Sequence, residues 1–394
     1  MYKASKLVLF ICMSFLGCLN AQQKQLYPKA QISVLSIGPG TSLNDAFGHS
    51  AFRIKDQRAH IDLVFNYGIY DFSTPNFYLK FAQGKLNYLC GVNYYQDFYE
   101  SYVAQNRTIK EQILDLSQDE KQGLFNYLLN NVKPENRAYL YDFFYDNCAT
   151  RIRDVLEKVA NDSIVFKAPD AFKQKTFRRL IHDHVNQNSW GSFGIDLALG
   201  AVIDKKASGY EHMFLPEYIN TFFENATFNG SNKRLVKQSR VLYKKLERPK
   251  PRNFLSSPLF VFINMSLIIL LITYFDYKKK KRTAWLDITL FSITGIIGIL
   301  MLLLWFATDH GATAQNYNLL WASALNVFMM GQLFRKKISP WFIKYLKFLV
   351  IMLCLLMLHW SIGVQVFAIT LIPLLIALLL RYVFLIHHVK HSQS

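Results

Sequence analysis

The chain has 394 residues, of which 52% are hydrophobic, and it carries a formal net charge of +18. Its dense basic clusters, Lys278–Arg282 and Arg335–Lys337, flank apolar runs in the way that membrane topology signals do. Because no zinc-finger, helix-turn-helix or RNA-binding signature is present either, we expect no nucleic-acid partner. The length allows one sizeable exported domain followed by membrane-spanning segments.

Residues 1–21 are predicted to be a secretory signal peptide. Lys3 and Lys6 give it a positive start, and Leu7–Leu16 forms the short apolar run that such signals require. Two alternatives remain open, namely a lipid attached to Cys18 and a signal that is retained as an uncleaved anchor. Each of these three outcomes places the residues that come after the signal outside the cytoplasm.

Residues 22–230 are expected to form this exported domain. Short runs rich in Val, Ile and Phe predict strands, and two capped segments with apolar stripes predict helices. The strands are expected at 31–37, 50–55 and 61–66, and the helices at 117–131 and 147–159. Strands that precede helices in this way are typical of an α+β fold.

Two segments on this scaffold carry side chains suited to chemistry. His49 stands at the start of a predicted strand, and Cys148 stands in the first turn of a predicted helix. The partial positive charge of a helix N-terminus is expected to lower the pKa of a thiol, and Arg151 on the same helix face is expected to help. A thiolate beside a histidine is the working unit of cysteine acyl transfer, and backbone N–H groups at the helix start can act as an oxyanion hole.

A third residue should orient the imidazole of His49. Asp62 and Asn66 point to one face of the next predicted strand, and His60 precedes it. Asn66 is favoured, since its amide can accept a hydrogen bond from the imidazole and fix the tautomer. A contrary possibility is that Cys148 forms a disulfide with Cys90, the other cysteine of the exported domain, which would remove the nucleophile.

The C-terminal half is predicted to cross the membrane. Residues 231–256 are expected to be a basic juxtamembrane linker, 257–386 a bundle of five transmembrane helices, and 387–394 a cytoplasmic tail. The five apolar segments are Pro258–Phe275, Trp285–Phe306, Tyr317–Phe334, Trp341–Leu358 and Ile362–Ile386. Several helical spans together with an exported N-terminal domain predict a multi-pass protein of the inner membrane.

Polar residues in the bundle have few predicted roles. The ionisable residues Asp287, His359 and Arg381 fall near helix ends, and no buried chain of charges of the kind used by transporters is expected. An outer loop contains His310, Asn316 and Asn318. It is either a polar connection at headgroup level or a site where these three residues contact a lipid headgroup or a lipoprotein.

At this point the sequence resembles a known family, the Bacteroides-type lipoprotein N-acyltransferases (Lnb). The likeness covers nearly all of the chain that follows the signal. The segments that carry it are Gly48–Ala51, Phe65–Gly68, Phe77–Gly84, Asp146–Arg151, Gly191–Pro216 and the outer loop Asp309–Asn318.

This resemblance implies a circularly permuted papain-like domain of the NlpC and lecithin–retinol acyltransferase type, in which the histidine precedes the cysteine. It implies that Cys148 takes an acyl chain from a phospholipid as a thioester, with His49 as the base and no metal or soluble cofactor. The acceptor would be the α-amine of a diacylated lipoprotein. Asn147 and Arg151, which flank the cysteine, are candidate substrate-binding residues together with those of the outer loop.

Two rival functions remain open on the sequence. The first is a cell-wall cysteine peptidase or amidase of the NlpC type, which would use the same Cys148–His49 pair. The second is a membrane assembly or binding protein without catalytic activity. Five membrane spans favour embedded lipid substrates over the soluble substrates of a peptidase.

Overall fold

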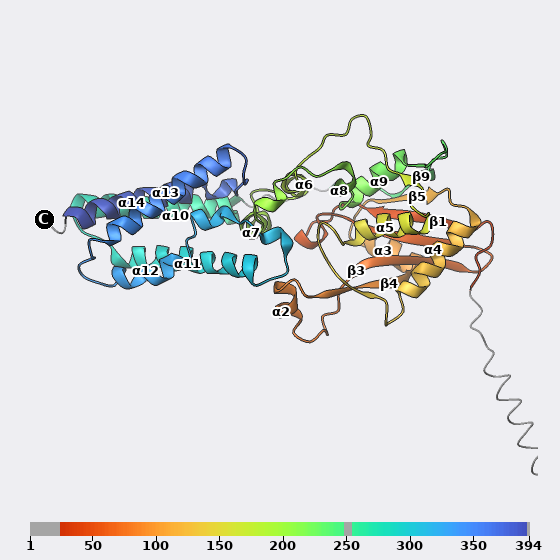
Figure 1. The fold of residues 1–394 in the computed structure, drawn as a ribbon, viewed down its shortest axis with the longest axis horizontal. Coiled ribbons are helices and arrows are strands. Elements are labelled where there is room, and N and C mark those ends of the chain that lie inside the picture. Colours follow the sequence, from red (N-terminus) through yellow and green to blue (C-terminus); the bar gives the residue numbers. More distant parts are fainter. Residues whose placement is uncertain (1–23, 248–253, 392–394) are drawn as a thin grey trace, which may run out of the picture.

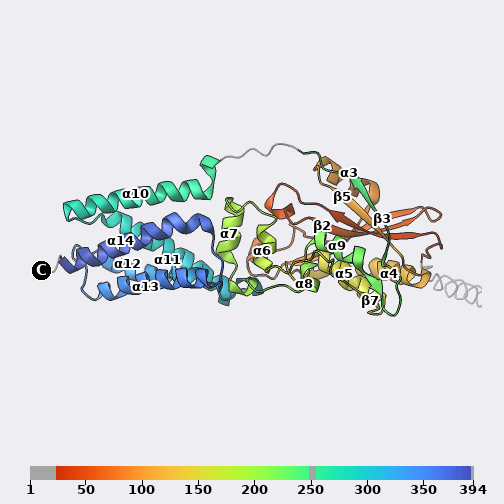
Figure 2. The same cartoon turned by 90° about the horizontal axis from the view of Figure 1, so that it is seen from above.

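We describe a computed structural model of the chain over residues 24–247 and 254–391. It has an α+β domain at one end and a bundle of helices at the other, with α6 (Phe177–His182) and α7 (Trp190–Ala198) between them (Figures 1 and 2). The expected signal peptide lies outside the described residues. The mixed fold class predicted from the sequence is confirmed.

The α+β domain is built on a seven-stranded antiparallel sheet with the strand order β6-β4-β3-β2-β1-β5-β9. Its strands are β1 (Gln31–Ile37), β2 (His49–Asp56), β3 (Ile61–Ile69), β4 (Asn87–Tyr94), β5 (Ile109–Leu114), β6 (Ala138–Leu140) and β9 (Val236–Tyr243). A separate two-stranded ribbon pairs β7 (Ile164–Val165) with β8 (Thr227–Phe228). The first three strands lie where the sequence predicted them.

Helices cover both faces of the large sheet because successive side chains of its strands point in opposite directions. Val34 and Phe52 face a core that also includes α4 (Gln118–Asn131), α5 (Cys148–Val159) and α9 (Pro216–Asn225). Leu35 and Ala51 face α3 (Tyr95–Ala104) on the other side. The predicted capping box that starts α4 is present, with Ser117 accepting a hydrogen bond from the backbone of Glu120.

Strand β9 corrects the predicted linker at 231–256. Residues 236–243 pair with β5, and Arg240 forms a 2.6 Å ion pair with the buried carboxylate of Glu111. This strand forms an edge of the sheet, and edge strands commonly carry charged side chains that discourage pairing with other molecules. Those charges made the segment look like a solvated linker in the sequence.

Four helices of the bundle are long and apolar enough to cross a membrane. They are α10 (Pro258–Lys279), α11 (Ala284–Phe306), α13 (Phe342–Ser361) and the helical segment Ile369–His391, which contains α14 (Ile372–His391). The fifth predicted span, Tyr317–Phe334, is not one continuous helix in the described structure. It forms the 3₁₀ helix η5 (Tyr317–Leu320) and the short helix α12 (Leu325–Leu333).

Polar contacts explain why this fifth segment is interrupted. Asn318, in η5, is fully buried and donates to the backbone oxygen of Asp196 in α7, at 2.9 Å. Asn326, in α12, is also fully buried and donates to Thr294 of α11 at 2.8 Å. Unpaired amides in an apolar environment are costly, so these contacts fix the chain around the break.

A buried network of charges lies inside the bundle, contrary to the expectation from the sequence. Arg381 is completely buried and donates to Asp287 at 2.6 Å and to Asp276 at 2.8 Å. Arg282 pairs with the other oxygen of Asp287. Residues from α10, α11 and α14 form the network, so it depends on packing between helices that a sequence does not reveal.

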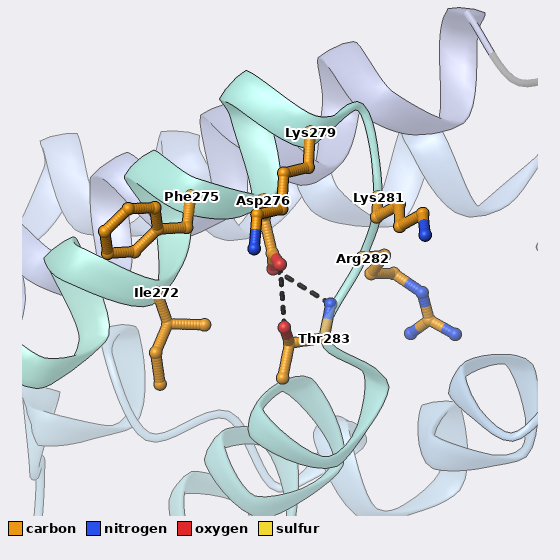
Figure 3. Close-up of a pocket in the computed structure, with 7 residues that line it drawn as sticks. All are labelled: Ile272, Phe275, Asp276, Lys279, Lys281, Arg282 and Thr283. Atoms are coloured by element: carbon orange, nitrogen blue, oxygen red, sulfur yellow. Dashed lines mark hydrogen bonds between the residues drawn. The ribbon is translucent and has the colours of Figure 1, made fainter.

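An open pocket lies beside this network, at the ends of α10 and α11 that are remote from the exported domain. Figure 3 shows Asp276 accepting hydrogen bonds from the backbone and the hydroxyl of Thr283, while the side chains of Lys281 and Arg282 point away from it. The lining residues are Ile272, Phe275, Asp276, Lys279, Lys281, Arg282 and Thr283. Because of its position, this pocket plays no part in the site described next.

Candidate active site

Cys148 is the first residue of α5, and its place is fixed by the residue before it. The Asn147 side chain caps the helix by accepting hydrogen bonds from the backbone of Ala149 and Thr150, at 2.8 and 3.0 Å. Its amide nitrogen also donates to the backbone oxygen of Phe214, at 2.8 Å. Asn147 is buried, so these contacts give it a structural role at the base of the nucleophile.

His49 is the first residue of β2 and lies beside the cysteine segment. The backbone N–H of the next residue, Ser50, is near enough to the Cys148 sulfur to act against the rise in the pKa of the thiol. The imidazole stacks on the ring of Tyr102 from α3, with ring centres 6.2 Å apart. Its Nε2 atom is buried and has no hydrogen-bond partner among the described residues, so the ring is not hydrogen-bonded to the Cys148 sulfur in this structure.

The three candidates for orienting His49 lie in different surroundings. The side chain of Asn66 donates to Asn93 at 2.9 Å and is near enough to His49 to raise the pKa of the imidazole slightly. Asp62 is occupied by a 2.7 Å ion pair with Arg53. His60 lies in the turn between β2 and β3, at the other end of β2 from His49. Of the three, only Asn66 is among the groups that affect the pKa of the imidazole.

Burial sets the resting protonation of the pair. It raises the pKa of the Cys148 thiol to about 11, although hydrogen bonds from the backbone of Ser50, Cys148 and Ala149 act in the opposite direction. Burial also lowers the pKa of His49 to about 4, against a smaller opposing effect of Asn66. The helix N-terminus therefore acts to lower the thiol pKa as expected, but the effect of burial is larger. At pH 7 both Cys148 and His49 are neutral.

Arg107 is a neighbour of the pair that the sequence did not single out. It is buried, its Nε donates to the backbone oxygen of Gly38 at 2.9 Å, and its guanidinium lies 4.8 Å from the centre of the Tyr102 ring. Its charge lowers the pKa of both Cys148 and His49, as a secondary effect after burial. Nothing local distinguishes this arginine, because it lies in a polar turn that only the fold brings to the site.

Arg151, the cation expected to assist Cys148, has other partners. Its guanidinium forms two hydrogen bonds with Asp146 and lies 4.3 Å from the centre of the Tyr139 ring. Arg107 therefore supplies the positive charge that was expected from Arg151. Cys90 and Cys148 are both free thiols, so they form no disulfide in the structure.

The outer-loop residues hold the two halves of the protein together. Asn316 and Asn318 are buried and donate to backbone oxygens of α7, at 2.8 Å for Leu197 and 2.9 Å for Asp196. His310 contacts the backbone oxygen of Phe81 through Nε2, at 3.0 Å. These contacts give the two asparagines a structural role instead of an accessible position for binding substrate.

The site lies at the end of the sheet that faces the bundle. The loop before His49 reaches α7, where Leu43 would lie 3.0 Å from a Cβ atom placed on Gly191. Helix α7 in turn packs on α10, with the rings of Phe193 and Phe262 5.1 Å apart. These contacts connect the loop before His49, through α7, to the helix bundle.

The fold defines a membrane protein with an α+β domain joined to a helix bundle, and the α+β domain carries the candidate residues Cys148 and His49. Two family models match the chain, the Lnb N-terminal periplasmic domain over residues 20–183 and the Lnb transmembrane domain over residues 250–393. The chain therefore belongs to the Lnb family, and it is a multi-pass membrane protein with a periplasmic N-terminal domain. No curated protein and no solved structure matched it.

Proposed function

We propose that this protein is a lipoprotein N-acyltransferase of the inner membrane that works through a thioester on Cys148. Membership of the Lnb family is consistent with this reaction class. The observation that carries the proposal is the position of Cys148 in the first turn of α5, where its Cβ atom lies 3.8 Å from a Cβ atom placed on Gly68, in the strand that pairs with the His49 strand. The order of the parts, histidine on a strand and cysteine on a later helix, is the one implied for a permuted papain-like domain.

In the first half of the reaction, His49 removes the proton of the Cys148 thiol as the sulfur attacks the ester carbonyl of a phospholipid. The new C–S bond forms, the C–O bond to glycerol breaks, and protonated His49 returns its proton to the glycerol oxygen. A lysophospholipid leaves. The backbone N–H groups of Ser50, Cys148 and Ala149 favour the charged form of the thiol, which supports their role in stabilising negative charge on the sulfur.

In the second half, the α-amine of a diacylglyceryl-cysteine attacks the thioester. The N–C bond forms, the C–S bond breaks, and the amine proton passes by way of His49 to the sulfur, which restores the thiol. Asn66 acts as a positioning residue, since its contact holds the imidazole in one orientation. The neutral resting pair suits this scheme, because His49 can accept a proton only while it is unprotonated.

The proposal is tested with the purified full chain in phospholipid nanodiscs, by mass spectrometry of the Cys148 peptide. We expect an adduct with the mass of a fatty acyl group, its absence in Cys148→Ser, and its persistence in the control Cys90→Ser. Addition of a diacylated lipopeptide should remove the adduct and yield a triacylated product. Peptide cleavage without any acyl adduct would instead favour the peptidase and overturn the proposal.

A second test uses cells that depend on this protein for lipoprotein maturation. Cys148→Ser should reach the membrane at normal levels and leave the lipoproteins diacylated. Normal triacylation in such cells would contradict the proposed reaction.

A further inference from the structure

The segment between β3 and β4 exposes an unusual number of aromatic side chains. In this aromatic segment, residues 70–83, Phe72 is 66% exposed and Tyr78 is 79% exposed. Leu79 and Phe81 are exposed as well, and both belong to the short helix α2 (Phe77–Ala82). The rings of Phe72 and Phe77 lie 4.8 Å apart and form one cluster. A contiguous exposed apolar surface on an exported domain indicates a binding surface.

This segment is attached to the outer end of the membrane bundle. The backbone N–H of Asp309 donates to the backbone oxygen of Gln83 at 2.8 Å. The His310 side chain contacts the backbone oxygen of Phe81. Asp309 follows α11 closely, and Phe306, at the end of that helix, is 72% exposed. Figure 1 shows α2 beside the end of the bundle that faces the sheet domain. The aromatic segment is therefore continuous with the lipid-facing surface of α11.

The same segment leads back to the candidate active site. A Cβ atom placed on Gly68, two residues before Tyr70, would lie 3.8 Å from the Cβ atom of Cys148. A row of rings also runs from the aromatic segment toward Cys148. The ring centres of Tyr70 and Tyr88 lie 5.6 Å apart, and Tyr88 stacks on Tyr141 with ring centres 4.2 Å apart. Burial and, after it, the nearby Cys148 thiol raise the pKa of Tyr141.

We propose that the aromatic segment dips into the outer leaflet and guides a phospholipid acyl chain along the Tyr70–Tyr88–Tyr141 rings to Cys148. Tyrosine is favoured at the membrane interface because its apolar ring carries a hydroxyl group that can stay hydrated, and the phenylalanine rings of the segment are apolar throughout. Asp71 and Lys80 are the charged residues of the segment, so little charge has to be desolvated on entry. The acyl-transfer part of this inference depends on the proposed function, whereas the insertion of the segment does not.

Insertion is tested by a photo-reactive phenylalanine analogue placed at single positions of the full chain in phosphatidylethanolamine–phosphatidylglycerol nanodiscs. After irradiation, position 78 should carry a phospholipid-mass adduct, as should position 271 on the exposed surface of α10, where Leu271 is 57% exposed. Position 94 is the matched control, because Tyr94 is 70% exposed but ends β4 away from α2. A lipid adduct at 271 without one at 78 would overturn the inference, and so would a protein adduct at 78 in native membranes.

Guidance of the acyl chain is tested with two ester donors, nanodisc phospholipid and a monomeric short-chain ester. In Tyr78→Glu, the ratio of acylation rates at Cys148 for the embedded and the soluble donor should fall about ten-fold, because the carboxylate opposes insertion. Tyr94→Glu should leave this ratio unchanged. An unchanged ratio in Tyr78→Glu overturns the guidance step. Absence of acylation from both donors in the unaltered protein instead refutes the proposed function, and the photo-adduct at 78 still tests insertion.

Discussion

The protonation of Cys148 can be measured directly through its alkylation. The pKa of this thiol is raised from 9.0 to about 11, so its thiolate fraction near neutral pH is lower than that of an ordinary cysteine by about 100-fold. Iodoacetamide reacts with the thiolate. The labelling rate of the Cys148 peptide, followed by mass spectrometry, should therefore rise about ten-fold per pH unit without a plateau up to about pH 10.

Two arginine variants sharpen this experiment. Arg107→Met removes a charge that favours the thiolate, so labelling at a given pH should slow further by several-fold, and Arg107→Lys should recover part of the rate. Arg58→Met is the matched control, since Arg58 lies over Tyr27, away from the site. A labelling rate of the unaltered protein that levels off below about pH 8 would refute the neutral resting pair, because it would reveal a stable thiolate.

Three further predictions concern folding stability, each measured by thermal unfolding of the full chain in detergent. Burial lowers the pKa of His49 from 6.5 to about 4, so its neutral form stabilises the fold above pH 6.5, and this stability is lost as the pH falls through 4. Between about pH 7 and 4.5 the free energy of unfolding should fall by about 2 kcal/mol more in the unaltered protein than in His49→Asn. Equal falls in the two proteins would contradict the burial argument. Asn147→Ala removes the cap of α5 and should cost about 1–2 kcal/mol, and no loss would show that the cap is dispensable. Arg381→Met leaves Asp276 and Asp287 without their buried partner and should cost about 3–5 kcal/mol, with a neutral effect counting against the network.

Local signals in the sequence predicted the parts of the fold that local interactions determine. The predicted helix at 147–159 corresponds to α5, because Asn147 is a strong capping residue and an apolar stripe follows it. The predicted strand at 31–37 is β1, whose alternating side chains fill two cores. The pairing of His49 with Cys148 was inferred from their chemistry and stays a prediction, although Ser50, next to His49, is near enough to affect the pKa of the thiol.

What the sequence did not reveal depends on contacts between distant residues. Arg107 reaches the site only because α3 and β5 bring its turn beside Tyr102. The partners of Arg381 come from two other helices, more than 90 residues away in the chain. The predicted direction of the pKa shift of Cys148 was wrong for the same reason. Burial by the whole domain raises this pKa and outweighs the local effect of a helix N-terminus.

Strand β9 has a practical consequence for anyone who expresses the periplasmic half alone. A fragment ended at residue 230, where the sequence placed the domain boundary, would lack the outermost strand and leave unpaired the backbone groups of β5 that bond to β9. It would also leave Glu111 without its ion pair to Arg240. An open edge of this kind recruits strands from other molecules, so such a fragment should aggregate, and its cloning boundary belongs beyond Tyr243.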